Sequence, residues 1–144
     1  MEGAEGQRRD QAASRGQPLI VLDTHTLVWW LGEPDRLSVR ARNALDGEDG
    51  LIVPSIVFWE VALLVRDRRV ELGYAMPEWV RLVRSLSRVE VAPLTPEIAV
   101  DSVDLDMHPD PADRFIVATA LARGVPLVTK DRKIRAVEGL ETVW

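Results

Sequence analysis

The sequence predicts an α/β fold: one domain in which helices flank a central parallel sheet of about five strands. Two observations predict it. Short apolar segments of strand length recur along the 144-residue chain, and segments with helical patterning or helix caps fill the gaps between them. Strands that alternate with helices pair in parallel, because each helix returns the chain to the edge where the previous strand began. In this architecture, ligands gather where strands end and helices begin.

Each element has its own signal in the sequence. The expected strands are the apolar runs at residues 19–22, 51–54, 89–93, 126–129 and 142–144. A first helix is expected at 24–31, and Ser38 and Ser55 predict two further helix starts as N-caps. Pro77 is typical of a first helical turn. The last two helices begin at "TPEIAVDSV" and "PADRFIVATALARG", and Gly124 is expected to end the second of these.

Length and composition fit a single globular domain. The chain is 47% hydrophobic, contains no cysteine and carries a net charge of −5, so the core is expected to form without disulfides. No apolar run has the length of a membrane span and no signal pattern opens the chain, which makes the cytoplasm the expected location. Residues 1–17 have almost no large apolar side chain and are predicted to be a flexible leader, before a domain over residues 18–144.

Two acidic residues stand where apolar residues are expected. Asp23 lies inside the apolar run "PLIVLDTHTLVWWL", and a buried carboxylate without a partner costs several kcal/mol. Glu60 lies on the core-facing side of a predicted helix. Its neighbours on that face are Ile56, Val57, Leu63 and Leu64. Both carboxylates therefore need a partner.

Asp113 and Asp131 complete a set of four. The helical face of Asp113 continues through apolar residues, and Asp131 follows the strand at 126–129. Because parallel strands end at one edge of the sheet, we expect Asp23, Glu60, Asp113 and Asp131 to converge on one cleft. Clustered carboxylates repel one another unless a divalent cation holds them. Oxygen ligands without a histidine or cysteine cluster suit Mg²⁺ or Mn²⁺.

Three of these acids also have an ordinary structural role. Asp23 would equally well cap the helix that starts at Thr24. Asp113 would serve as a first-turn acid favoured by the helix dipole, and Asp131 as a turn residue. The conjunction of four such residues favours a site. By contrast, Glu97, Asp101 and Asp104 share one helical face and are predicted to form a solvated stripe.

Four ordered motifs resemble those of PIN-domain nucleases, in particular the VapC-type ribonuclease toxins of bacterial toxin–antitoxin pairs. They are "LDTHTLVWWL", "PSIVFWEVALL", "HPDPADRFIVATAL" and "LVTKD", and the resemblance covers residues 19–144. It implies a PIN-like fold in which Asp23, Glu60, Asp113 and Asp131 are the catalytic residues and bind Mg²⁺ or Mn²⁺. One departure is Leu64, where many relatives carry a lysine.

The resemblance also implies an activity and partners. The activity is endonucleolytic hydrolysis of RNA phosphodiesters by a metal-activated water, leaving 5′-phosphate and 3′-hydroxyl ends. Thr129 would hold a ligand or a water, and Thr24 and Asp110 are expected to support the ligands or the substrate. The implied partners are an RNA substrate, an antitoxin protein and a second copy of the chain, with no membrane.

Basic and aromatic residues are expected beside an acidic cleft that takes RNA. Arg114 and Lys130 are favoured as phosphate contacts because they adjoin Asp113 and Asp131. Further candidates are Arg66, Arg68, Arg69, Arg81, Arg84, Arg88 and Arg132, although the stripe from Arg81 to Arg88 is equally a solvated helix face. His25 and His108 are interpreted as structural residues first. Of the consecutive Trp29 and Trp30, one is expected at an interface, the alternative being the edge of the core.

Two other functions compete with the nuclease. One is a PIN-like RNA-binding or scaffold module without catalytic activity, against which the presence of all four acids argues. The other is a metal-dependent phosphatase of an α/β fold. The haloacid-dehalogenase-like pattern requires an aspartate where this chain has His25, which argues against that alternative.

Overall fold

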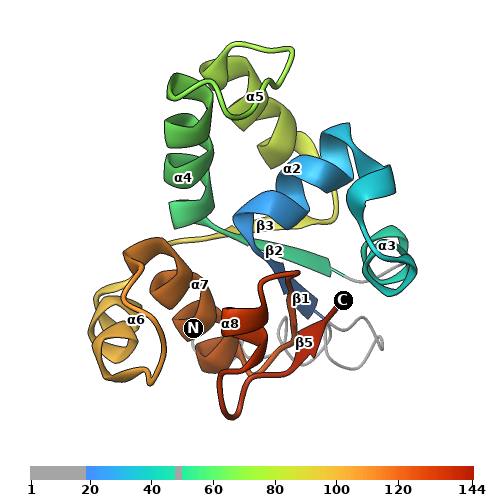
Figure 1. The fold of residues 1–144 in the computed structure, drawn as a ribbon. Coiled ribbons are helices and arrows are strands. Elements are labelled where there is room, and N and C mark those ends of the chain that lie inside the picture. Colours follow the sequence, from blue (N-terminus) through green and yellow to red (C-terminus); the bar gives the residue numbers. More distant parts are fainter. Residues whose placement is uncertain (1–18, 48–49) are drawn as a thin grey trace, which may run out of the picture.

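The computed structural model describes residues 19–47 and 50–144 (Figure 1). Five parallel strands form one sheet in the order β3-β2-β1-β4-β5. They are β1 (Leu19–Leu22), β2 (Gly50–Pro54), β3 (Val89–Ala92), β4 (Leu127–Val128) and β5 (Thr142–Val143). The predicted single α/β domain with a five-stranded parallel sheet is confirmed. The leader predicted at residues 1–17 lies outside the described residues.

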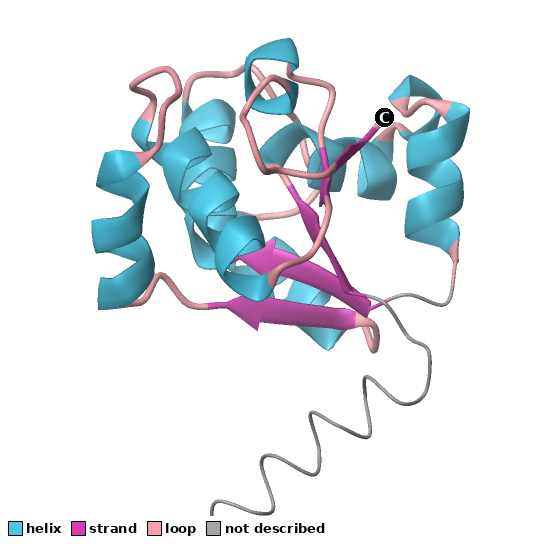
Figure 2. Ribbon diagram, turned by 90° about the horizontal axis from the view of Figure 1, so that it is seen from below, coloured by secondary structure: helices cyan, strands magenta, loops and turns pink. Residues whose placement is uncertain are grey.

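Within the described ranges, seven α-helices and two 3₁₀ turns flank the sheet (Figures 1 and 2). The helices are α2 (Thr24–Gly32), α3 (Val39–Asp46), α4 (Ser55–Arg66), α5 (Met76–Ser85), α6 (Pro96–Asp101), α7 (Pro111–Arg123) and α8 (Arg132–Arg135). The 3₁₀ turns are η1 (Pro34–Arg36) and η2 (Ser102–Asp104). In residues 19–47 and 50–144, none of the helices has the length and apolarity of a membrane span.

Two of the predicted capping residues, Ser38 and Gly124, lie at helix ends as expected. The Ser38 hydroxyl accepts a hydrogen bond from the Ala41 N–H at 3.0 Å, and Gly124 ends α7 in the left-handed conformation with φ 63°. Ser55 is a correction. It is the first residue of α4 and not its N-cap, and its hydroxyl accepts from the Leu94 N–H at 3.1 Å. Ser55 therefore joins the start of α4 to the segment after β3.

The hydrophobic core holds the sheet rigidly, and with it the residues at the carboxyl ends of the strands. Side chains on both faces of the central strands are completely buried, among them Val21, Leu22, Ile52 and Val53, as expected for a parallel sheet covered by helices. Helix α7 packs against β1 and β2. Burial of each large aliphatic side chain contributes about 1.5 to 3 kcal/mol.

The strand order creates a switch point at the centre of the sheet. The chain leaves β1 toward β2 on one side, whereas β4 pairs with β1 on the other side. The helices that follow β1 and β4 therefore diverge from adjacent strand ends, which is where open α/β sheets bind ligands. Asp23 directly follows β1, and Asp131 lies three residues after β4.

Candidate metal centre

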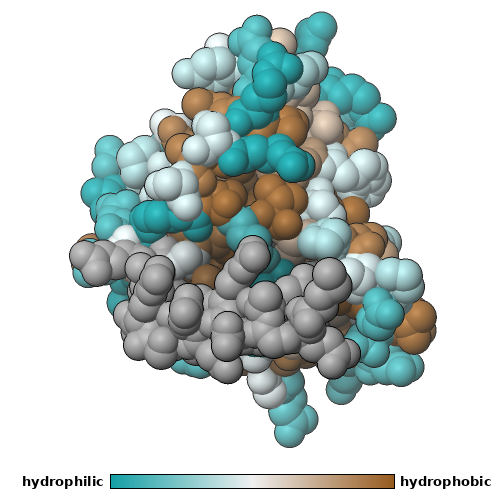
Figure 3. Space-filling view, turned by 180° about the vertical axis from the view of Figure 1, so that it is seen from behind, coloured by the Kyte–Doolittle hydropathy of each residue, from teal (hydrophilic) through white to brown (hydrophobic). Residues whose placement is uncertain are grey.

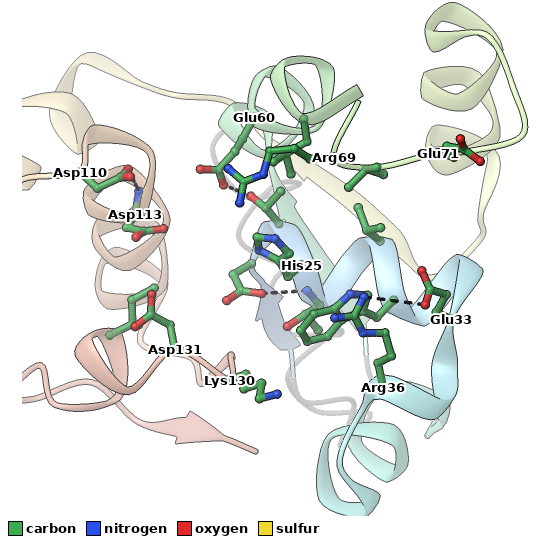
Figure 4. Close-up of a pocket in the computed structure, with 18 of the residues that line it drawn as sticks. His25, Glu33, Arg36, Glu60, Arg69, Glu71, Asp110, Asp113, Lys130 and Asp131 are labelled. Carbon is green, nitrogen blue, oxygen red and sulfur yellow. Dashed lines mark hydrogen bonds and ion pairs between the residues drawn. The ribbon is translucent and has the colours of Figure 1, made fainter. Parts of the chain in front are cut away.

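Four separate elements bring the four acids to one pocket of about 980 Å³ (Figure 4). Asp23 caps α2 and Asp131 caps α8, while Asp113 lies in the first turn of α7. Glu60 projects from the middle of α4. The convergence expected from the sheet topology is therefore present in the structure.

Asp23 is both a helix cap and a member of the cluster. It is 8% exposed, and its Oδ1 accepts a hydrogen bond from the Thr26 N–H at 3.0 Å. Burial raises the pKa of the carboxyl, and hydrogen bonds from Thr129 and Thr26 lower it by less. The Thr129 hydroxyl also accepts from the Asp131 N–H at 3.1 Å. Thr129 thus links the two strand-end aspartates.

Glu60 is tied to the end of β1 through Thr24. The Thr24 hydroxyl donates to Glu60 Oε1. Burial raises the pKa of Glu60, the Thr24 hydrogen bond opposes that rise, and the neighbouring Asp110 and Asp23 charges add to it. Thr24 is itself buried, so it positions this carboxylate relative to the sheet.

The pKa of Asp113 is strongly raised. Burial is the largest cause, and repulsion from Asp110, Glu60, Asp131 and Asp23 follows, so that its pKa rises to about 7. Asp110 caps α7 by accepting from the Asp113 N–H at 3.2 Å. All four of these charged neighbours are acids, so each of them opposes ionisation of Asp113.

Two groups of side chains have their ligand atoms within 4.8 Å of one another, and Asp113 belongs to both. One group is Glu60, Asp110 and Asp113; the other is His108, Asp113 and Asp131. The Nε2 atom of His108 lies 3.3 Å from Asp113 Oδ2 and is buried without a hydrogen-bond partner among the described residues. Carboxylate oxygens at this spacing fit a hard divalent cation.

The comparisons with known proteins agree with this geometry. The model of the PIN domain family matches residues 20–140. The chain belongs to the PIN-domain family. It is 39% identical over 119 residues to Ribonuclease VapC22 of Mycobacterium tuberculosis, covering 81% of this chain and 90% of that protein. The predicted PIN-domain family is therefore confirmed, and the similarity to a named ribonuclease supports the predicted nuclease class.

Solved structures share the fold at low sequence identity. The sarcin-ricin loop cleaving toxin VapC20 of Mycobacterium tuberculosis has a TM-score of 0.63 at 18% identity, over 81% of this chain and 93% of that chain. VapBC2 from Rickettsia felis bound to a promoter DNA fragment has a TM-score of 0.62 at 18% identity, over 86% and 96%. DNA-bound VapBC from Salmonella typhimurium has a TM-score of 0.61 at 21% identity, over 88% and 97%.

Arg114 has a structural role in this PIN domain, which corrects the expected phosphate contact. All three guanidinium nitrogens donate to backbone carbonyls in the segment between α6 and α7. The acceptors are Ser102, Val103, Leu105, Met107 and His108. Because His108 is the last of these acceptors, Arg114 fixes the part of the chain that places the imidazole beside Asp113.

We expect Arg114→Ala to lower the free energy of unfolding by about 2 to 4 kcal/mol, because several carbonyls lose a charged donor at once. Urea unfolding measures this loss. Arg81→Ala, at an exposed position on α5, is the matched control and should change stability by less than about 0.5 kcal/mol. Equal stability of the two variants would contradict the structural role of Arg114.

The structure also sorts the other basic candidates. Arg68, Arg69 and Lys130 line the pocket of the PIN domain, as does Arg36, which sequence reasoning missed. Arg132 and the stripe from Arg81 to Arg88 are not part of the pocket lining. Arg36 comes from the short turn η1, which has no periodic pattern, so no local signal predicts it.

The structure also places the two histidines and the two consecutive tryptophans. His108 contacts Asp113, and its place in the proline-rich turn before Asp113 is the sequence signal for this contact. His25 lines the pocket. Trp29 is 8% exposed, and the indole of half-buried Trp30 donates to Asp46 at 3.2 Å. Both side chains pack at the edge of the core, and an interface role for one of them stays a prediction.

Proposed function

We propose that this PIN-domain protein is an endoribonuclease that depends on Mg²⁺ or Mn²⁺ held by Asp23, Glu60, Asp113 and Asp131. The observation that carries the proposal is the convergence of these four carboxylates, from four elements, on one pocket. Burial and mutual repulsion raise the pKa of Asp113 to about 7, a cost that a bound cation removes. The alternatives of an inactive module and of a phosphatase have no comparable support.

The acids of the cluster and the residues that hold them have defined roles in this proposal. A bound divalent cation supplies charge neutralisation of the scissile phosphate and a lower pKa for an attacking water. Asp23, held by Thr26 and Thr129, offers a fixed oxygen at the end of the central strand. Asp113 offers oxygens to both groups of ligand atoms. Thr24 holds Glu60 in the orientation that faces them.

The donor chemistry favours the two proposed cations. Carboxylate oxygens dominate the cluster, and hard cations with flexible or octahedral coordination prefer such ligands. One imidazole nitrogen, from His108, also belongs to the cluster. Mg²⁺ prefers ligand sets made of oxygen atoms, whereas Mn²⁺ also accepts an imidazole nitrogen. Both ions therefore belong in the test.

The test is cleavage of a mixed pool of structured RNA by the purified protein in Mg²⁺, in Mn²⁺ and in EDTA. We expect endonucleolytic products with either cation, none in EDTA, and recovery when the cation is restored in excess. Labelling of the product ends should detect 5′-phosphate and 3′-hydroxyl groups. Undiminished cleavage in EDTA would exclude the proposed chemistry.

A protein partner also belongs to the proposal. The similarity to the solved VapBC structures from Rickettsia felis and Salmonella typhimurium supports an antitoxin partner for this chain. A homodimer and a cytoplasmic location are further parts of the proposal. Large apolar side chains that a partner would cover include Trp59 and Tyr74, at 53% and 54% exposure. The face in Figure 3 shows an apolar area bordered by polar side chains, as interaction surfaces often do.

A further inference from the structure

We propose that Trp29, Arg36 and Lys130 form a binding site for a backbone phosphate of the RNA, next to the metal centre. We call these three residues the Trp29 site. The inference rests on the proposed ribonuclease function and adds a place for a second phosphate, away from the one that is cleaved. All three residues line the same pocket as the four acids.

Trp29 is the fixed base of the site. Its ring is almost completely buried, with its centroid 5.5 Å from that of His25 and 6.0 Å from that of Trp144. These contacts join α2 to the end of the chain after β5. The ring therefore has one position, and a cation that lies over it is held there.

The guanidinium of Arg36 lies over this ring, and the edge of the guanidinium is open to solvent. The guanidinium carbon is 4.5 Å from the ring centroid, and the side chain is 56% exposed. The nearest carboxylate, Glu33, is 3.8 Å away and itself exposed, so this ion pair is weak. A planar guanidinium held by its face presents its N–H groups at the edge, in the arrangement that binds a phosphate through two oxygens.

Lys130 brings a second positive charge to the same ring. Its Nζ atom is 5.8 Å from the ring centroid of Trp29, and no ion pair of Lys130 occurs among the residues that the structure describes. Figure 4 shows Arg36 and Lys130 on one side of the pocket, and Asp110 and Asp113 on the other. Two cations at one ring repel each other, and an anion between them removes the repulsion.

The shared pocket identifies the anion. An RNA strand carries one phosphate per nucleotide, so a strand with one phosphate at the acids has neighbouring phosphates within the same pocket. Lys130 precedes Asp131 in sequence, and both residues line the pocket together with Arg36. An RNA strand that crosses from the four acids to the Trp29 site would therefore meet the proposed divalent cation at one end and the side chains of Arg36 and Lys130 at the other.

Fluorescence anisotropy with a labelled single-stranded RNA of twelve nucleotides tests the site. The full-length protein carries Asp23→Asn, so that the RNA stays intact during the measurement, and every further variant is made in this background. Adding Arg36→Ala should raise Kd about fivefold to tenfold and reduce the slope of log Kd against log salt by about 0.7, the value for one contact to a single strand. Arg36→Lys should keep the slope and lose part of the affinity.

Two matched variants complete the design. Glu33→Gln removes the competing carboxylate and should lower Kd about twofold to threefold. Arg42→Ala is the control, because Arg42 pairs with Asp35 at 3.0 Å and lies outside the pocket lining; its Kd should stay within about twofold. Circular dichroism confirms that each variant is folded.

The outcomes separate the Trp29 site from the function on which it rests. If the wild type cleaves RNA and Arg36→Ala leaves both Kd and the salt slope unchanged, the Trp29 site is wrong and the ribonuclease stands. A protein that neither binds nor cleaves RNA overturns both. A decaglutamate peptide that displaces the RNA only when Arg36 is present, and as tightly as RNA binds, would assign the site to an acidic protein segment instead.

Discussion

Asp23→Asn should reduce the rate of RNA cleavage by about 10²- to 10³-fold, the loss seen when one preorganised charge-stabilising group leaves an active site. Asp23 is the most deeply buried acid of the cluster, and its carboxylate oxygens have fixed positions because Thr26 and Thr129 hold it. The amide keeps the shape and the helix-capping oxygen but removes the negative charge that a divalent cation needs. Initial rates on a defined RNA in Mg²⁺ and in Mn²⁺ measure the effect.

Two readouts show whether this loss comes from the metal centre. The rise in melting temperature on adding Mn²⁺ to the wild type should disappear in Asp23→Asn, because cation binding stabilises only the folded state. Asp101→Asn is the matched control: it changes an exposed acid on α6 and should cleave at the wild-type rate. Wild-type cleavage by Asp23→Asn would remove this residue from the catalytic set.

Asp113→Asn should make the metal-free protein more stable than the wild type at neutral and alkaline pH. Burial and the surrounding carboxylates raise the pKa of Asp113 from 3.8 to about 7, so the folded state binds this proton more tightly than the unfolded chain does. Below pH 4 the group is protonated in both states and carries no penalty. As the pH rises from about 4 to 7, the wild type loses stability, and the loss is complete above the folded pKa.

Urea unfolding in EDTA at several pH values measures this difference. The variant should exceed the wild type by about 3 to 4 kcal/mol at pH 8 and by almost nothing at pH 4, since one pKa unit corresponds to about 1.4 kcal/mol. Saturating Mg²⁺ at pH 8 should reduce or reverse the difference, because only the wild type retains the full ligand set. Asp106→Asn, an exposed acid before α7, controls for net charge and should show no such pH dependence. Equal stability in EDTA at pH 8 would show that Asp113 bears no such cost.

The two predictions describe the same property of the PIN domain. Three features make the cluster costly without a cation: burial at a strand end, acids at helix starts, and four other carboxylates whose charges act on Asp113. They are also the features that would bind a cation tightly. A cluster with these properties is expected at a functional site and is hard to explain as a device for stability.

Local sequence signals explain why much of the fold and of the acidic cluster could be predicted. The strands follow from apolar runs, and the helix ends from residues such as Ser38 and Gly124, because capping depends on side chains a few positions apart. Asp23 and Glu60 stood out because each interrupts an apolar pattern that local periodicity defines. Parallel topology then required that residues at strand ends share one edge, so four acids distant in sequence could be assigned to one pocket.

The predictions that failed concern side chains whose partners are distant in sequence or set by irregular segments. Adjacency to Asp113 suggested that Arg114 contacts phosphate, but its donors are directed to the carbonyls of the segment before α7. Ser55 has the composition of a cap, but its hydroxyl accepts from Leu94, 39 positions away. Arg36 reaches the pocket only because η1 folds it over Trp29.

The sequence by itself determined the parallel sheet, the order of its elements and the four acids, because periodicity, capping and the direction of strands are properties of neighbouring residues. Only the tertiary structure decided which basic side chains line the pocket with those acids, which arginine donates hydrogen bonds to the segment before α7, and which tryptophan lies beneath Arg36. The physical reason is that a long polar side chain reaches several partners at similar energy, and packing of distant elements selects among them.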